Sequence, residues 1–360
     1  MDIPFVYYLT VIPLLGILIF IHELGHFLVA RAFGVGVEIF SLGFGPRITG
    51  KQSGMTDYRL SAIPLGGYVK MVGEDPAAAR EVEDTSISFA HKPLHQRTLI
   101  VLAGPVSNLV LAPLLLFGLY AGWGNTVLAP VIGEVQKDRP AMEAGLRAGD
   151  KVMAVNGNQV DSWDDMSEYI QKGAPGPVDI IVERGDGVRK FSVLLEKTTV
   201  QDMFGDEKQK YLVGIAPSYD ISHIHLGPGE AMGQALSHTW QVGYVTIKSI
   251  ARIFQGKLAA KEALGGPIMI AQMAGSTAKN SFADFLKLCA MLSATLGLIN
   301  LFPVPVLDGG HLAFFAYEAV ARKPLSLRVR EFMLQVGFVL LIMLMAYIIY
   351  IDIARSYGPS

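Results

Sequence analysis

The chain has 360 residues, of which 51% are hydrophobic and 17% are charged, and its mean hydropathy is +0.39. Soluble domains carry about 25% charged residues, so this composition excludes an ordinary cytosolic enzyme. Lys and Arg number 30 against 32 Asp and Glu, a balance that excludes a disordered chain and a basic nucleic-acid-binding surface. A single cysteine, Cys289, excludes an internal disulfide and a cysteine-based zinc cluster, so any metal must be held by His and carboxylates.

Four apolar segments are long enough to cross a bilayer, which takes about 20 residues in a helix. They run over residues 3–33, 99–119, 282–306 and 332–351. Asn300, Pro303 and Pro305 interrupt the end of the third segment. The first segment lacks the basic flank and the cleavage site of a secretory signal, so we expect it to be retained as a membrane span.

Basic residues predict how the spans are oriented. Lys and Arg gather between the first two spans and again between the last two, for example at Lys51 and Lys323. By the positive-inside rule both connections face the cytoplasm. The N-terminus, the long stretch over residues 122–280 and the C-terminus are then expected outside.

The long outer stretch changes character along its length. Residues 131–217 contain short β-branched runs separated by turns at Asn156–Gly157 and at residues 185–187, which predicts a small strand-rich domain. Residues 229–254 have the apolar spacing of an amphipathic helix that is too polar to span. This helix is expected on the outer membrane surface, although packing against the spans would produce the same pattern.

A candidate metal site lies inside the first span. His22 and His26 are one helical turn apart, so their imidazoles project from one face and can converge on Zn²⁺. Glu23 lies about 100° around the helix, where its carboxylate can take a proton from water at the metal. Histidine and glutamate are costly inside hydrocarbon, which favours a functional role over the alternative of simple helix-packing contacts.

A catalytic zinc site needs a third protein ligand and keeps a fourth position open for water. Asp308 is the candidate, because Pro303 and Pro305 forbid a regular helix before it and irregular backbone at membrane depth has to line a cavity. His311 is the alternative third ligand. The remaining histidines lack a convergent spacing and are expected to be solvated.

Taken together, these motifs resemble the site-2 protease family of intramembrane zinc metalloproteases, in particular the bacterial RseP-like regulator-of-sigma-E proteases. The matching stretches are His22–His26, Gly43–Pro46, Pro64–Gly73, Ala103–Asn108, Gly266–Ile268 and Asn300–His311. The resemblance implies that His22, His26 and Asp308 bind zinc and that Glu23 is the catalytic base. It also implies that Asn300 holds or orients the substrate backbone and that Asn108 belongs to the surroundings of the active site.

The stretch from Pro64 to Gly73 reads as a short hairpin with glycines at its bend. By the family resemblance it is a membrane-embedded β element near the zinc. An exposed strand edge could pair with an extended substrate, so Gly66, Gly67 and Tyr68 are expected to contact it. The alternative is a plain structural hairpin.

The outer domain resembles a PDZ module of the bacterial protease type, through Pro130–Val135, Ala144–Val152 and Val155–Gly157. PDZ domains bind a peptide as an added strand. The peptide groove is expected along Val131, Ile132, Gly133, Glu134 and Val135. The enterobacterial relatives carry two such modules in tandem, whereas only one fits here because the chain turns helical after about residue 217.

The sequence therefore predicts a polytopic α-helical membrane protein with a membrane-embedded β-hairpin and one inserted extracytoplasmic PDZ domain. The expected divisions are residues 1–125 with spans one and two, 126–217 with the PDZ domain, 218–280 with a juxtamembrane helical region, and 281–360 with spans three and four. The expected location is the bacterial inner membrane, with the zinc site near the cytoplasmic face.

The predicted activity is zinc-dependent cleavage of transmembrane segments in single-span proteins. By resemblance the substrates are anti-sigma factors already trimmed outside the membrane, or remnant signal peptides, processed in regulated intramembrane proteolysis. Lipid is an expected partner, and nucleic acids and nucleotides are not. The alternatives are a non-catalytic PDZ-bearing membrane scaffold and a metal transporter that uses the same site.

Overall fold

The computed structural model describes residues 9–75 and 82–357, and the chain forms two compact units. The first unit contains residues up to Gly118 together with Met232–Ile250 and Ala259–Ser360. The second contains Leu119–Ala231 and Ala251–Leu258. The predicted outer domain, residues 126–217, therefore lies within the second unit, which begins earlier and ends later than the sequence suggests.

Among the described residues, four helices are long and apolar enough to cross a membrane. They are α2 (Val11–Ala32), α3 (Leu94–Trp123), α9 (Phe282–Asn300) and α11 (Leu327–Tyr357). Their number confirms the four predicted spans. Helix α9 ends at Asn300, before the two prolines, so the third span is shorter than predicted. Much of α11 exposes apolar side chains such as Phe332 and Phe338 that the described residues leave uncovered, which fits a lipid-facing helix.

The β element of the first unit is larger than the predicted hairpin. Strands β1 (Val37–Ser53) and β2 (Thr56–Met71) form a long irregular sheet whose turn lies at residues 54–55. Residues 57–60 run parallel to residues 39–42, whereas residues 67–70 run antiparallel to them, so the chain reverses direction between residues 60 and 67 and the bend predicted beside Gly66 and Gly67 is present. The register shifts repeatedly, and residues 39–42 pair with both 57–60 and 67–70. In the described chain no strand pairs with the other side of residues 67–70, which leaves an open edge.

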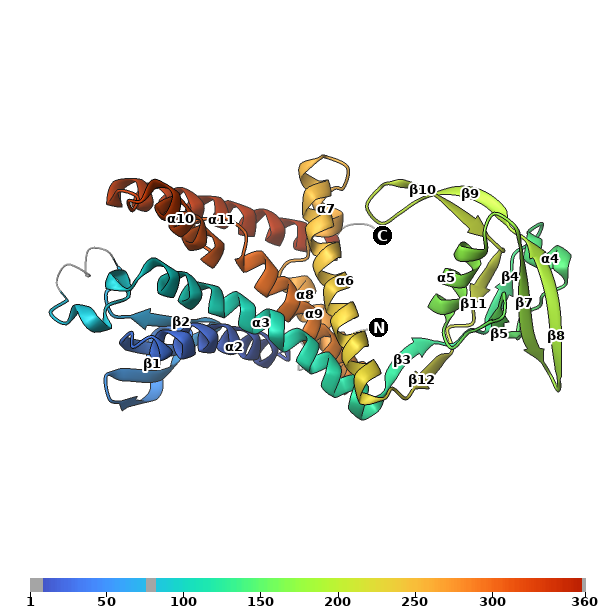
Figure 1. Cartoon of the computed structure of the whole chain (residues 1–360), viewed down its shortest axis with the longest axis horizontal. Helices are drawn as coiled ribbons and strands as arrows, with labels where there is room; N and C mark the ends of the chain where they lie inside the picture. The colour runs from blue at the N-terminus through green and yellow to red at the C-terminus, as the bar shows by residue number, and fades with distance from the viewer. Residues whose placement is uncertain (1–8, 76–81, 358–360) are drawn as a thin grey trace. The chain divides into compact units, whose positions relative to one another are not determined.

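The sheet packs against α2, and the two elements share an apolar core with α3. This core is formed by Ala30, Val37, Phe40, Val69, Met71, Ile100, Val101 and Phe315. A second cluster joins α2 to α8 and α9 through Leu14, Leu18, Ala274, Leu288 and Cys289. Figure 1 shows α2, α3 and the β1–β2 sheet running alongside one another. The segment His22–His26 of α2 is therefore held between α3 and the edge of the β1–β2 sheet.

Shorter helices complete the first unit. They are η2 (Thr85–Ile87), η3 (Phe89–His91), α7 (Ala260–Ala263), α8 (Pro267–Asn280) and α10 (Asp308–Ala321). The sequence did not predict α10, because its apolar run merges with the proline-containing loop. Helix α6 (Pro228–Phe254) connects the units and confirms the predicted amphipathic helix, with Ala231 and Ala235 buried and Trp240 and Tyr244 exposed.

The second unit is strand-rich, as predicted. Its main sheet has the order β6-β5-β7-β8, formed by β5 (Lys151–Val155), β6 (Asn158–Gln159), β7 (Pro177–Arg184) and β8 (Gly187–Leu194). The remaining pairs are β3 (Asn125–Leu128) with β12 (Ile221–Ile224), β4 (Ile132–Val135) with β11 (Ile215–Pro217), and β9 (Glu196–Gln201) with β10 (Glu207–Leu212). Helices α4 (Pro140–Ala144) and α5 (Trp163–Gly173) complete the unit. The pairing of β12 with β3 shows that strand structure continues past residue 217.

Candidate active site

Three potential metal ligands converge between α2 and the start of α10. His22 and His26 lie one turn apart on α2, and their Nε2 atoms are 3.3 Å from each other. Asp308, the first residue of α10, places its Oδ2 atom 3.0 Å from His22 Nε2 and 3.5 Å from His26 Nε2. Both histidines are buried, with relative exposures of 8% and 7%. His22 and His26 on α2 and Asp308, which is distant in the sequence, therefore form one compact set of potential metal ligands, here called the donor set.

This donor set fits zinc. Two ligands of a tetrahedral Zn²⁺ with bonds of about 2.0–2.1 Å lie about 3.3 Å apart, close to the three separations found here. The Nδ1 atom of His26 donates to the Ile100 carbonyl at 2.8 Å, which fixes the tautomer and leaves the Nε2 lone pair directed at the site. Two imidazole nitrogens and one carboxylate are common zinc ligands.

Glycine residues make room for the histidines. A Cβ atom on Gly104 of α3 would lie 2.2 Å from His26 Nε2. A Cβ atom on Gly25 would lie 2.2 Å from Ser107 Oγ and 2.4 Å from the Ala103 carbonyl oxygen. Helices α2 and α3 can therefore approach closely only because both positions lack a side chain. The motif containing Gly104 was part of the family resemblance, but its spatial role could not be read from the sequence.

The loop before α10 positions Asp308. Cβ atoms on Gly309 and Gly310 would lie 2.1 Å from the Phe302 carbonyl and 2.4 Å from the Val304 carbonyl, so the loop folds directly over the start of the helix. The prolines of this loop prevent α9 from continuing. A helix begins at Asp308 instead, and its carboxylate faces the two histidines. The predicted irregular backbone is thus present at the site.

A cavity of about 690 Å³, here called the main cavity, surrounds the donor set. Its walls include all three potential ligands and the predicted residues Glu23, Gly66, Gly67, Tyr68 and Asn300. The Glu23 carboxylate accepts a hydrogen bond from the backbone N–H of Val69 in β2. The structure therefore brings together the residues predicted from three distant motifs.

Asn108 is placed differently. It lies on α3 with no exposed surface and is absent from the walls of the main cavity. The backbone carbonyl of Asn108 accepts a hydrogen bond of 2.8 Å from the Ser293 hydroxyl. A Cβ atom on Gly297 would lie 3.2 Å from the Cβ atom of Asn108. Asn108 thus sits at the packed contact between α3 and α9, and its two side-chain polar atoms have no partner among the described residues. Its predicted place near the active site stays a prediction.

His311 lines the main cavity but is not part of the three-residue donor set. Its Nδ1 atom lies 3.5 Å from the Arg330 guanidinium, and its ring contacts Phe314. Asp308, and not His311, is therefore the third member of the donor set, a choice that the sequence left open. Arg330 and Glu74 also line the cavity, and sequence reasoning missed both. Burial raises the pKa of the Glu74 carboxyl above its usual range.

The predicted peptide groove of the second unit lies along β4 and the residue before it. Strand β4, which holds four of the five predicted residues, pairs with β11. Its Ile132 also donates to the Asp150 carbonyl at 2.9 Å and accepts from Gly149 at 2.8 Å. Val131 bridges to Lys151. Ile132 and Val131 therefore already have backbone partners, and the peptide groove along β4 stays a prediction.

Comparison with known proteins agrees with the geometry of the first unit. A protein of Agrobacterium fabrum, provisionally named a zinc metalloprotease, is 34% identical over 98% of this chain and 97% of its own length. A Campylobacter jejuni protein with the same provisional name is 34% identical over 98% of this chain and 94% of its own length.

One solved structure, the PDZ domain of an SdrC-like protein from Listeria monocytogenes, is 26% identical and covers 24% of this chain and 84% of that domain. Its TM-score of 0.20 does not establish a common fold. The model of peptidase family M50 matches residues 10–344. The chain therefore belongs to peptidase family M50, the site-2 protease family, and is a zinc metallopeptidase.

Proposed function

We propose that this metallopeptidase cleaves transmembrane segments of single-span membrane proteins. The observation that carries the proposal is the location of the donor set: its two histidines lie on a helix apolar enough to span a membrane, and the set shares a cavity with an open strand edge. A site for soluble substrates would gain nothing from such a setting, because polar groups in hydrocarbon are costly.

In the proposed mechanism His22, His26 and Asp308 would hold a zinc ion. Zinc held by three protein ligands activates water and polarises a carbonyl group. The Glu23 carboxylate takes a proton from the attacking water and later delivers it to the nitrogen of the leaving amine. The hydrogen bond from Val69 fixes the Glu23 side chain in the cavity. Each of these steps uses a group in the wall of the main cavity.

The substrate helix has to open before cleavage, because its peptide groups are hidden in internal hydrogen bonds. The open edge of β2, including Gly66, Gly67 and Tyr68, supplies replacement hydrogen bonds to one extended stretch. A Cβ atom on Gly67 would lie 3.3 Å from the Glu23 side chain, so the edge passes close to the base. Asn300 contributes a further amide to the substrate backbone.

The proposed substrates are anti-sigma factors trimmed outside the membrane, or remnant signal peptides, in regulated intramembrane proteolysis. The basic connections around Lys51 and Lys323 support an orientation in which the zinc site faces the cytoplasm of a bacterial cell. The strand-rich second unit then lies outside as a single PDZ domain that controls access.

The proposal is tested with the purified full chain in detergent and a tagged single-span model substrate. A zinc chelator should abolish cleavage within the transmembrane segment, and added Zn²⁺ should restore it. A tagged soluble protein serves as the control substrate and should stay intact. Cleavage that continues after metal analysis shows the zinc to be gone would contradict the proposal.

A further inference from the structure

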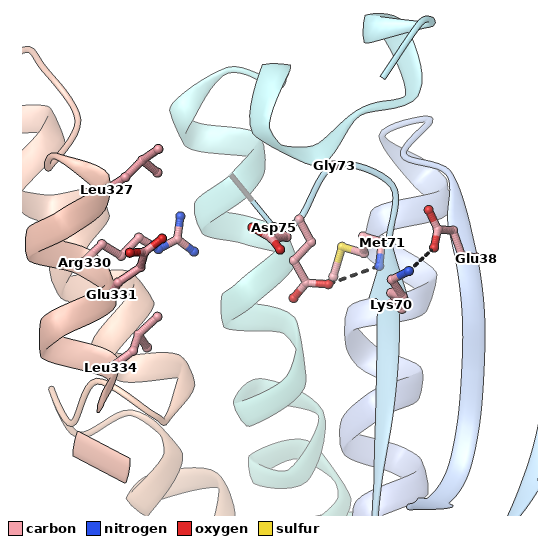
Figure 2. A pocket seen from close by; sticks show the side chains of 10 residues that line it. Glu38, Lys70, Met71, Gly73, Asp75, Leu327, Arg330, Glu331 and Leu334 are labelled. Carbon is pink, nitrogen blue, oxygen red and sulfur yellow. Dashed lines mark hydrogen bonds and ion pairs between the residues drawn. The ribbon is translucent and has the colours of Figure 1, made fainter. Parts of the chain in front are cut away.

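A second cavity adjoins the main one. It has a volume of about 470 Å³ and shares Met71, Glu74 and Arg330 with the walls of the main cavity. Figure 2 shows Arg330 on α11 reaching toward the opposite wall, where Met71 and Lys70 belong to β2. The two cavities therefore adjoin at the end of β2, and the second lies away from the donor set.

Arg330 has one buried donor without a hydrogen-bond partner. Its Nε atom is buried and has no hydrogen-bond partner in the described chain. Its Nη2 atom lies 3.5 Å from His311 Nδ1, at the outer limit of a hydrogen bond. A buried N–H donor that lacks an acceptor costs free energy, so the placement of this donor in a cavity wall points to a ligand that it receives there.

Residues of the open edge of β2 line both cavities. The backbone N–H of Met71 donates to Glu74 Oε2 at 3.1 Å, and that of Val69 donates to Glu23. Alternate residues of a strand direct their backbone groups to the same side, so both donors mark the side on which a new strand would add. Every second carbonyl of an added strand points away from β2, and Arg330 of α11 lines the same cavities.

The charges of the second cavity select the kind of ligand. Its described walls carry four carboxylates, on Glu38, Glu74, Asp75 and Glu331, and two cations, on Lys70 and Arg330. Lys70 is bound to Glu38 at 2.6 Å. This surplus of negative charge disfavours a phosphate or a carboxylate as ligand of Arg330. A neutral peptide carbonyl, which accepts hydrogen bonds without adding charge, fits the site.

We propose that Arg330 is a substrate-binding residue whose guanidinium donates to an outward-facing backbone carbonyl of the extended substrate on β2. The substrate strand then has partners on both sides, β2 on one and Arg330 on the other. This inference rests on the proposed function, because it requires an extended peptide in the cavity. In this role Arg330 contributes to substrate affinity and takes no part in the chemical step.

The test compares steady-state kinetics of the zinc-loaded full chain on the single-span substrate. Arg330→Gln should raise KM ~10-fold or more, the effect of losing a hydrogen bond to a charged group, with kcat and zinc content unchanged. Arg330→Lys should give an intermediate KM, since an ammonium donates but lacks the planar fork. The matched control is Arg328→Gln, an exposed residue two positions earlier on α11, which should behave as wild type.

A double variant separates direct binding from an effect through Glu74. In a Glu74→Ala background, Arg330→Gln should raise KM by the same factor as in the wild type. Disappearance of the effect in that background, or an unchanged KM in both Arg330 variants, overturns the inference. These outcomes differ from failure of the proposed function, in which the wild-type chain itself does not cleave the substrate.

Discussion

Glu23 is the residue on which the proposed chemistry depends most directly. Glu23→Gln keeps the shape of the side chain and its place beside β2 but removes the base. We expect zinc to remain bound while proteolysis falls by at least ~10²-fold, the lower range for general acid–base catalysis. Metal analysis and cleavage of the model substrate measure the two properties separately. Near-normal cleavage by this variant would refute the role of Glu23.

Gly104 tests how the ligand geometry is maintained. Gly104→Ala would place a methyl group 2.2 Å from His26 Nε2, while the opposite ring nitrogen is held by Ile100. The ring must turn away, and we expect zinc affinity to fall by ~10–100-fold, as for lost outer-shell support of a ligand. Gly118→Ala on the same helix is the control, because nothing lies within 4 Å of its Cβ position. Equal zinc affinities for the two variants would contradict this account of the site.

The reversal of the chain within β2 is the main finding at the scale of the elements. Proline and paired glycines usually mark a turn, which is why the bend was expected at Gly66 and Gly67. In the structure a Cβ atom on Gly66 would lie 1.9 Å from the Phe44 ring, and one on Gly67 would lie 2.8 Å from the Ser41 carbonyl. These glycines permit close packing where the chain reverses between residues 60 and 67, and a separate turn at Gly54 joins β1 to β2.

An ion pair connects the strands of the second unit. Asp150 is fully buried and accepts hydrogen bonds from Arg184 at 2.6 and 2.7 Å and from the backbone of Arg147 at 2.8 Å. Burial alone would raise the pKa of the Asp150 carboxyl, but these donors hold it below its usual value. A lowered pKa stabilises the fold above the unfolded-state value of about 3.9 and loses that effect as the pH falls further.

This ion pair predicts a loss of stability in acid. Hydrogen exchange of the β5, β7 and β8 amides, measured on the full chain, should accelerate as the pH is lowered through about 4 and below, after correction for intrinsic rates. Asp150→Asn should accelerate it at neutral pH, because breaking a buried ion pair costs about 3–5 kcal/mol. The exposed pair of Asp179 and Lys190 is the control, and Asp179→Asn should have little effect. Unaltered exchange in Asp150→Asn would exclude this stabilising role.

For the whole molecule, the proposed orientation in the membrane is open to labelling. Cys289 is first changed to Ala, and single cysteines are placed at Ser53, Lys323 or Asp186, all of which are exposed. A membrane-impermeant thiol reagent should label intact cells at position 186, where any outer membrane admits it, and should spare positions 53 and 323. Their exposure means that protection reports the membrane side rather than burial. The reverse pattern would place the zinc site on the outer side.

Much of the candidate site was predictable because its information is local. The spacing of His22 and His26 fixes their common helix face, and the long apolar segments predict the spans from composition alone. The family match supports a zinc metallopeptidase as predicted. These features depend on residues a few positions apart, so they can be predicted from the sequence without knowledge of the fold.

Other features depend on contacts between distant parts of the chain, and only the tertiary structure decided them. The choice of Asp308 over His311 follows from how the loop folds over α10, and the room for His26 follows from a glycine on α3. The pairing of β4 with β11 and the arrival of Arg330 opposite β2 have no local signal either. Packing between distant segments places these groups. Composition or periodicity within one segment does not indicate which residue of another segment will lie across the cavity.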